Sequence, residues 1–273
     1  MGYRRRLQNA FEHAQCLPLG ENTRYILLSD CHRGTGTSYD NFLKNQHLYV
    51  AALQYYMQRG YYYIELGDGE ELWENRCRDQ IISSHCETYR LFDILERKCR
   101  ITRLFGNHDH VMEGVLPEAV ILQTGNGCVK IGLTHGHQVD FKNSVMCCLT
   151  RFLVRYLWRP LEQFGVNDPT SAAKNNKRAD RTERKLEQWA KENGIILVTG
   201  HTHRPRLTET VYQAAEGIYL NTGSCVHPYG ITGIELNGLR AYLVKWKMTA
   251  GSDMILRAER EILAGPLVMI ACN

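Results

Sequence analysis

The stretch "LFGNHDH", Leu104 to His110, sets an asparagine, two histidines and an aspartate directly after an apolar run. The run "ITRLF" (101–105) is typical of a short buried strand, so the polar residues fall where that strand is expected to end. Packing alone gives no reason to crowd such side chains together. We therefore asked which other strands of the chain end in the same way.

Two earlier segments do so. "RYILLS" (24–29) and "YYYIEL" (61–66) are continuous apolar runs that predict buried strands, and they lead into "DCH" and "GDGEE". Helical patterns from about Asp40 to Arg59 and over roughly 79–98 separate the three runs. The order strand, helix, strand, helix, strand predicts a parallel sheet, in which functional residues collect at the carboxyl ends of the strands.

The rest of the chain predicts more strands and one helical insertion. "AVILQ" and "CVKIGLTHG" are strands separated by the turn signal "TGNG", and "ILVTGHTH" is a buried strand that ends in histidines. "GIYLNTGS", "GITGIEL", "LRAYLVKWKM" and about 254–262 predict a meander, while residues 4–15 form a short basic helix and residues 141–193 a helical insertion. We expect one α/β domain over residues 1–273.

Composition excludes several classes of protein. The 273 residues suffice to bury a core, and a net charge of +4 is too small to indicate a nucleic-acid binder. The ten cysteines fall at irregular spacings without a C-x-x-C pair, which favours reduced thiols in a cytoplasmic protein over a disulfide framework. The N-terminus lacks the apolar region of a signal peptide, and no apolar run is long enough to span a membrane.

The polar residues that follow the strands form a consistent set of possible metal ligands. Any one of these motifs alone is more often structural, but five of them in one chain favour a shared site. The set comprises Asp30, His32, Asp68, Asn107, His108, Asp109, His135, His201 and His203. Carboxylates and imidazoles suit manganese, iron, zinc or cobalt. Two such ions about 3.5–4 Å apart need a bridging carboxylate, and Asp68, which follows the small Gly67, is the natural candidate.

In this order the motifs "SDCH", "GDGEE", "GNHD", "THGH" and "GHTH", from residue 29 to 203, resemble the calcineurin-like metallophosphoesterase family. The resemblance implies a four-layer α/β/β/α sandwich and two divalent metal ions, for which we expect manganese, with iron, zinc or cobalt as the alternatives. It implies that Asp30, His32 and His203 bind one ion and that Asn107, His135 and His201 bind the other. Asp68 would bridge both ions together with a hydroxide that attacks the phosphate.

The same resemblance assigns the catalytic residues. His108 matches the family's catalytic histidine, which we expect to act as general acid, and Asp109 matches the carboxylate that orients it. We also take Arg33 and Asn107 as substrate contacts. His110 has no role in the family, and we interpret it as structural or solvent-facing.

A finer resemblance points to the bacterial UDP-2,3-diacylglucosamine diphosphatase branch. The stretch "GDGEELW" carries Glu71 and Trp73 as that branch does, and the insertion at 141–193 stands where the branch has one. The chain departs from that branch at His108, where its members have arginine.

The insertion carries a basic stripe on an amphipathic pattern. Arg151, Arg155 and Arg159 recur at helical spacing in "VMCCLTRFLVRYLWRPLEQF". This pattern predicts a cap helix packed on the sandwich with a solvated basic face, and peripheral contact with lipid or a membrane is the alternative.

Three functions follow from the sequence. The first is hydrolysis of a phosphate ester, phosphodiester or pyrophosphate bond in a small anionic molecule, such as a sugar nucleotide or a lipid-linked substrate. The second is a metal-dependent nuclease, but no aromatic residues interleave with a basic groove, so we expect no nucleic-acid partner. The third is a non-catalytic scaffold, which predicts lost ligands, whereas every motif residue is present. The substrate, the metal and the oligomeric state stay open.

Overall fold

The computed structural model describes residues 2–140, 176–212 and 216–270. Its larger sheet has seven strands in the order β4-β3-β2-β10-β11-β12-β8. Strands β2 (Arg24–Leu28), β3 (Tyr62–Leu66) and β4 (Ile101–Leu104) pair in parallel. The predicted parallel arrangement is confirmed, so the polar stretches after these three strands lie at one edge of the sheet.

Three of the four strands of the predicted meander belong to this sheet, whereas "GIYLNTGS" forms β9 (Ile218–Asn221) of the smaller sheet, where it pairs in parallel with β7 (Ile196–Thr199). Strand β10 (Ile231–Asn237) pairs antiparallel with β2 and with β11 (Arg240–Ala250), which in turn pairs with β12 (Leu256–Met269). The last strand therefore continues to residue 269 instead of ending near 262. The short β8 (Val211–Tyr212) pairs only with the final residues of β12.

The smaller sheet has five strands in the order β1-β5-β6-β7-β9. Strands β5 (Ala119–Thr124), β6 (Lys130–Thr134), β7 (Ile196–Thr199) and β9 (Ile218–Asn221) match predicted apolar runs. Strand β1 (Gln15–Leu19) was not predicted, because its sequence "QCLPL" is short and contains a proline. It lies at the sheet edge, where a strand can tolerate a residue that has no N–H to donate.

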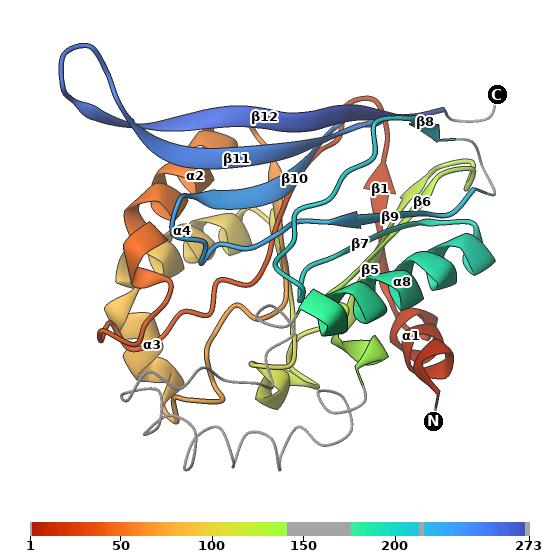
Figure 1. Cartoon of the computed structure of the whole chain (residues 1–273), viewed down its shortest axis with the longest axis horizontal. Coiled ribbons are helices and arrows are strands. Elements are labelled where there is room, and N and C mark those ends of the chain that lie inside the picture. The colour runs from red at the N-terminus through yellow and green to blue at the C-terminus, as the bar shows by residue number, and fades with distance from the viewer. Residues whose placement is uncertain (1, 141–175, 213–215, 271–273) are drawn as a thin grey trace.

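The two sheets pack face to face around one hydrophobic core. Side chains from both sheets meet there, among them Leu27, Ile64, Leu122, Leu133 and Val198. Helices α2 (Gln46–Gln58), α3 (Arg78–Ser84) and α4 (Cys86–Arg97) cover the outer face of the larger sheet, and α1 (Tyr3–Glu12) and α8 (Asn176–Asn193) cover the smaller one. This is the predicted four-layer α/β/β/α sandwich (Figure 1).

The helix predicted over 79–98 is two helices in the structure. It breaks at His85, whose backbone leaves the helical region at φ −117° and ψ 36°. The buried His85 ring turns inward, and its Nε2 lies 2.8 Å from a carboxylate oxygen of Asp40 in the segment before α2. The helix predicted from about Asp40 to Arg59 begins in the structure with a short 3-10 turn, η1 (Leu43–Asn45), before α2.

The predicted insertion at 141–193 is described only from residue 176. There, α8 packs Leu186 and Trp189 against Leu197 and Tyr219 of the smaller sheet. Helix α8 thus belongs to the outer layer of the sandwich and does not form an added cap. Residues 141–175, which include Arg151, Arg155 and Arg159, lie outside the described residues.

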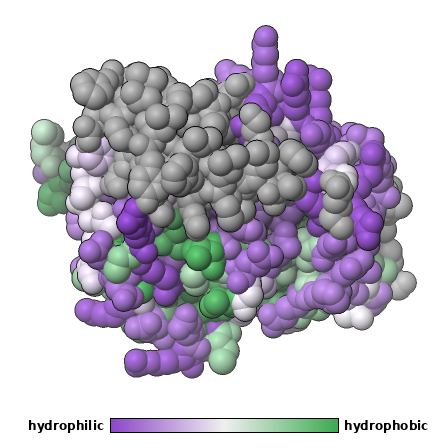
Figure 2. Space-filling view, turned by 90° about the horizontal axis from the view of Figure 1, so that it is seen from below, coloured by the Kyte–Doolittle hydropathy of each residue, from purple (hydrophilic) through white to green (hydrophobic). Residues whose placement is uncertain are grey.

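Seen from below, most of the described surface is hydrophilic (Figure 2). Within the three described ranges, no helix combines the length and the hydrophobicity that crossing a bilayer requires.

Candidate metal centre

The seven predicted metal ligands follow strands of both sheets. Asp30 and His32 follow β2, Asp68 follows β3 and Asn107 follows β4; His135 follows β6, and His201 and His203 follow β7. The structure brings them together. The possible ligand atoms of Asp30, His32 and His203 lie within 4.8 Å of one another, as do those of Asp68, His135 and His201.

The first group converges on one carboxylate. Asp30 Oδ1 lies 3.0 Å from His203 Nε2 and 3.8 Å from His32 Nε2. The two imidazole Nε2 atoms are themselves only 3.3 Å apart. Two ring nitrogens that face each other at this distance beside a carboxylate oxygen suit a shared cation.

The second group includes Asn107. His135 Nε2 lies 3.2 Å from Asp68 Oδ2 and 3.2 Å from Asn107 Oδ1. Asp68 Oδ2 is also 3.7 Å from His32 Nε2 of the first group. Asp68 therefore stands between the two groups, which is the position that a bridging carboxylate needs.

Backbone strain marks the same residues. Asp30, His32, Asp68, His201 and His203 all have left-handed φ angles, between 46° and 67°. Residues other than glycine seldom adopt this conformation, and in proteins it persists mainly where the surroundings impose it, often at functional sites. Five of the seven predicted metal ligands therefore share this strained conformation.

The donor set fits a pair of divalent cations. His201 Nε2 is buried and has no hydrogen-bond partner among the described residues. His135 Nδ1 donates to the Leu66 carbonyl at 2.8 Å, which leaves its Nε2 lone pair for a metal. The number and the identity of the ions stay predictions.

Charges in the site also suit cations. Burial would raise the pKa of Asp68, but the imidazoles of His135, His108 and His32 outweigh it and hold the pKa below its usual range. Burial and the neighbouring His135 lower the pKa of His201 to about 3. Asp68 is thus ionised and His201 neutral near pH 7, the forms in which both residues bind metal.

His108 is held beside this centre by Glu71 and Trp73. His108 Nδ1 lies 2.8–2.9 Å from the Glu71 carboxylate oxygens, and the Trp73 ring stacks on the imidazole at 4.2 Å between ring centroids. The other Glu71 contact is His32 Nδ1, at 2.9 Å. Burial lowers the pKa of His108, but Glu71 and Asp68 outweigh burial and raise it, which favours a protonated ring.

Asp109 does not orient His108 as predicted. Its buried carboxylate accepts backbone N–H groups instead, from Gly106 at 2.5 Å and from Gly69 at 2.9 Å. Asp109 therefore joins the loop after β4 to the loop after β3, and Glu71 takes the role that the sequence assigned to Asp109.

Arg33 is not placed to contact a substrate. Its side chain is fully buried and makes two hydrogen bonds of 2.8 Å to Glu65 in β3. Arg103 in β4 lies 2.7 Å from Glu65 and 2.9 Å from Glu70, so the four residues form a buried network of alternating charge. The prediction failed because a lone arginine after D-x-H gave no sign of its partner on β3.

Glu71 contacts two predicted site residues, His32 and His108, but the sequence did not indicate it as a residue of the site. It stands in "GDGEELW", where it was noted only as a mark of one family branch. The signal was the pair of adjacent glutamates, Glu70 and Glu71, that follows Asp68 after a single glycine. By contrast, His110 lies outside the ligand groups, and its Nε2 is 3.3 Å from Glu113, as expected for a residue without a role in the site.

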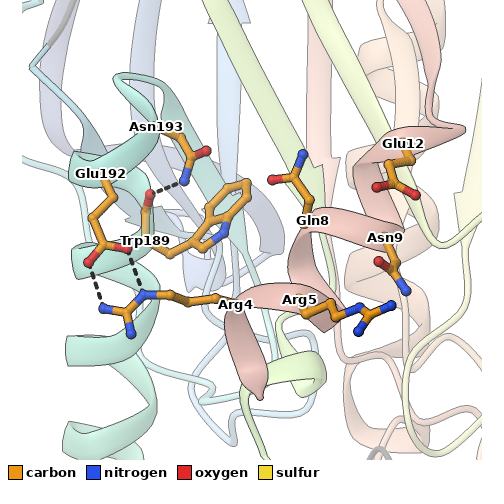
Figure 3. A pocket seen from close by; sticks show the side chains of 8 residues that line it. All are labelled: Arg4, Arg5, Gln8, Asn9, Glu12, Trp189, Glu192 and Asn193. Carbon is orange, nitrogen blue, oxygen red and sulfur yellow. Dashed lines mark hydrogen bonds and ion pairs between the residues drawn. The ribbon is translucent and has the colours of Figure 1, made fainter. Parts of the chain in front are cut away.

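A hollow of about 630 Å³ lies elsewhere, between α1 and α8 (Figure 3). Arg4 and Glu192 form an ion pair across it, and none of the predicted site residues lines it. Its lining offers no group of converging metal ligands, so it is distinct from the candidate metal centre.

Comparison with protein-family models and with curated proteins finds no match. Among solved structures, the chain is similar to a conserved uncharacterized protein, a predicted phosphoesterase, from Streptococcus pneumoniae, with 17% identity and a TM-score of 0.39 over 88% of this chain and 97% of the other. It is also similar to Vps29 from Chaetomium thermophilum, with 11% identity and a TM-score of 0.42 over 88% and 95%. TM-scores this low carry no argument about function. The four-layer fold therefore rests on the strand order and the packing described above.

Proposed function

We propose that this chain is a calcineurin-like metallophosphoesterase that hydrolyses a phosphate ester, phosphodiester or pyrophosphate bond in a small anionic molecule. The observation that carries the proposal is the placement of Asp68 between two groups of histidines and carboxylates. An arrangement of this kind is what a two-metal phosphoesterase needs.

The chain offers ligands for two divalent cations, for which manganese, iron, zinc and cobalt are suitable. Asp30, His32 and His203 would hold one ion, Asn107, His135 and His201 the other, and Asp68 both. When bound, the ions supply Lewis acidity, which neutralises phosphoryl charge and lowers the pKa of water.

His108 supplies the proton that the leaving group needs. Glu71 accepts the Nδ1 proton and Trp73 covers one face of the ring, so the ring is held with Nε2 directed away from Glu71. A protonated Nε2 can then donate to the leaving oxygen as general acid. Because Glu71 also contacts His32, one carboxylate would position a metal ligand and the acid together.

The resemblance of "GDGEELW" to the UDP-2,3-diacylglucosamine diphosphatase branch favours a sugar nucleotide diphosphate as the substrate. His108 in place of arginine favours a leaving group that must be protonated over one that is already a stable anion.

A substrate panel tests the function. The metal-depleted protein is supplied with Mn²⁺ and offered p-nitrophenyl phosphate, bis-p-nitrophenyl phosphate, sugar nucleotides and single-stranded DNA. We expect Mn-dependent turnover of a small phosphate compound and none of DNA. Turnover of DNA alone would favour the nuclease, and bound metal without any turnover would favour the scaffold.

The matched variants are Asp68→Ala and Asp93→Ala. Asp93 is an exposed aspartate on α4 and belongs to none of the ligand groups. Asp68→Ala should abolish turnover and reduce the metal content, while Asp93→Ala should change neither. Equal activity in the two variants would contradict the proposed function.

A further inference from the structure

Strands β11 and β12 form an arm that projects from the larger sheet at the far left of Figure 1. Among the described residues, β10 accompanies β11 only as far as Trp246, and beyond it β11 pairs with β12 alone. The arm ends in three consecutive apolar side chains: Met254 is 85% exposed, Ile255 56% and Leu256 66%. Hydrophobic residues occupy the same far-left position in Figure 2.

The arm is amphipathic. Cross-strand partners share a face, and the pairs Met248–Ala258 and Ala250–Leu256 continue the face that carries Trp246. Trp246 is only 4% exposed because the tyrosines of α2 pack on it, whereas Met248 is 49% exposed. The apolar face of the arm therefore continues beyond the part that α2 covers.

The opposite face and the turn hold charges that neutralise each other. Lys247 Nζ lies 2.9 Å from Glu261, and Arg257 pairs with Asp253 at the turn. Asp253 Oδ1 also accepts the Ile255 N–H at 3.1 Å, and the Met254 N–H donates to the Gly251 carbonyl at 2.9 Å. The turn is thus built to present apolar side chains on an ordered frame that has little net charge.

We propose that the tip of this arm, Met254 to Leu256, inserts into the interfacial region of a lipid bilayer. A stable protein interface needs about 800 Å² per partner and some 20–30 residues on each side, and a tip two strands wide offers only a few side chains. A bilayer, in contrast, surrounds a narrow tip and buries each apolar side chain separately. Since the charges of the arm are paired internally, insertion depends on apolar burial and only weakly on anionic lipid.

Flotation with vesicles tests the proposal on the full chain. Vesicles of phosphatidylcholine, with and without phosphatidylglycerol, are mixed with the wild type and with the triple variant Met254→Ser, Ile255→Ser, Leu256→Ser. We expect the wild type to float with both kinds of vesicle, and the triple variant to bind about tenfold more weakly or worse, because three apolar side chains no longer enter the lipid. Val115→Ser, which removes a 72% exposed apolar side chain in the segment between β4 and β5, should bind as the wild type does.

A second measurement does not depend on loss of binding. Met254→Trp should show a blue-shifted emission with vesicles, and lipids brominated on their acyl chains should quench it. Wild-type protein that stays in solution, equal binding of the triple variant, or an unquenched tryptophan would overturn the proposal. It would also be overturned by a wild-type dimer in light scattering that the triple variant converts to a monomer, since the tip would then be a protein interface. The proposed hydrolase activity enters none of these outcomes, so either proposal can fail alone.

Discussion

At the scale of single residues, His108 is held from two sides. The Glu71 carboxylate fixes its Nδ1, and the Trp73 ring covers one of its faces. An imidazole held in this way has one nitrogen available for a substrate and little freedom to turn. The contribution of His108 to kcat should therefore depend on whether the leaving group needs a proton from that nitrogen.

We predict that His108→Ala lowers kcat for an alkyl phosphate ester by about 10²–10⁴, the usual contribution of a positioned acid. The loss on p-nitrophenyl esters should be much smaller, because p-nitrophenolate leaves without a proton. Steady-state kinetics with both substrates, at unchanged metal content, measures the difference. Equal losses on both would mean that His108 stabilises charge on the phosphoryl oxygens instead.

Glu71→Gln should reproduce this dependence on the leaving group, because glutamine no longer favours the protonated ring. It should also weaken metal binding by about 10–100-fold, since Glu71 supports the ligand His32.

Asp109→Asn should lower activity on both substrates alike, because Asp109 binds backbone N–H groups of the two loops. Kinetics and metal titration of the two variants together separate these roles. If only Asp109→Asn showed a dependence on the leaving group, Asp109 and not Glu71 would be the carboxylate that orients His108.

Some residues of the site could be predicted from the sequence pattern, and others could not. The strand-end positions of Asp30, Asp68 and His135 follow from apolar runs that stop at polar residues, and the sequence indicated them. The partner of His108 does not follow in this way. Asp109 is adjacent in sequence but its carboxylate points to the loop after β3, and only the three-dimensional path of that loop brings Glu71 to the ring.

At the scale of elements, the loops after β3 and β4 approach so closely that no side chain fits between them. A Cβ atom on Gly106 would lie 2.3 Å from Asp68 Oδ1 and 2.8 Å from His135 Cδ2. Gly106→Ala must therefore displace the carboxylate that stands between the two ligand groups. We expect a folded protein that loses about 10²-fold in kcat/KM, as displacements of about 1 Å can cause, and that binds less metal.

Gly125→Ala is the matched control, because nothing lies within 4 Å of a Cβ atom at Gly125. Circular dichroism verifies that both variants fold, and metal analysis with kinetics compares them. Full activity in Gly106→Ala would show that the two loops can separate without harm to the site.

The contact between Asp40 and His85, at the break between α3 and α4, should make the free energy of unfolding depend on pH. The Asp40 carboxylate accepts the Gly36 and Phe42 N–H groups and lies 2.8 Å from His85 Nε2. Burial raises the pKa of Asp40, but the hydrogen bonds from His85 and Gly36 outweigh burial and lower it. Because the folded pKa lies below the unfolded one, this carboxylate stabilises the fold above the unfolded pKa, and the stabilisation is lost as the pH falls through the folded pKa.

Asp40→Asn should therefore lower the free energy of unfolding by about 1–3 kcal/mol near pH 7. Its difference from the wild type should shrink as the pH falls from 7 to below the ordinary aspartate pKa of about 3.9, because the folded pKa lies lower still. Urea denaturation over this range measures both curves. A difference that stays constant down to the lowest pH would contradict the assignment.

Elements with a continuous apolar run were predictable, and those defined by distant partners were not. Strands β2, β3 and β7 were predictable because both of their faces are buried, so that each appears in the sequence as a continuous apolar run. Strand β1 is formed by pairing with β5 at an edge, which leaves most of its residues at least partly exposed. The helix break at His85 depends on Asp40, which lies 45 residues earlier in the chain.

At the scale of the whole molecule, the candidate centre joins the two sheets. Its ligands follow β2, β3 and β4 of the larger sheet and β6 and β7 of the smaller one. Cations bound there should stabilise the entire sandwich, because unfolding either sheet would release them. We expect Mn²⁺ at about 100 times its dissociation constant to add about 2.7 kcal/mol to the free energy of unfolding.

Calorimetry with a chelator and then with Mn²⁺ measures this increase as a rise in Tm. Asp68→Asn should weaken the response, whereas Asp93→Asn should keep it. A single unfolding transition that Mn²⁺ moves as a whole is the expected result. An unchanged Tm in the wild type would show that no metal joins the sheets.

The buried network of Arg33, Glu65, Arg103 and Glu70 has a consequence for how this chain can change through descent. Its two arginines and two glutamates link β2, β3 and β4 directly beneath the loops that carry the ligands. Loss of Glu65 leaves the fully buried Arg33 guanidinium without its carboxylate partner, at a cost of about 3–5 kcal/mol. A lineage can therefore not exchange Glu65 alone, and it must pass it on with Arg33 or replace both residues together. The Arg33–Glu65 pair beneath the candidate centre is in this sense a single heritable unit.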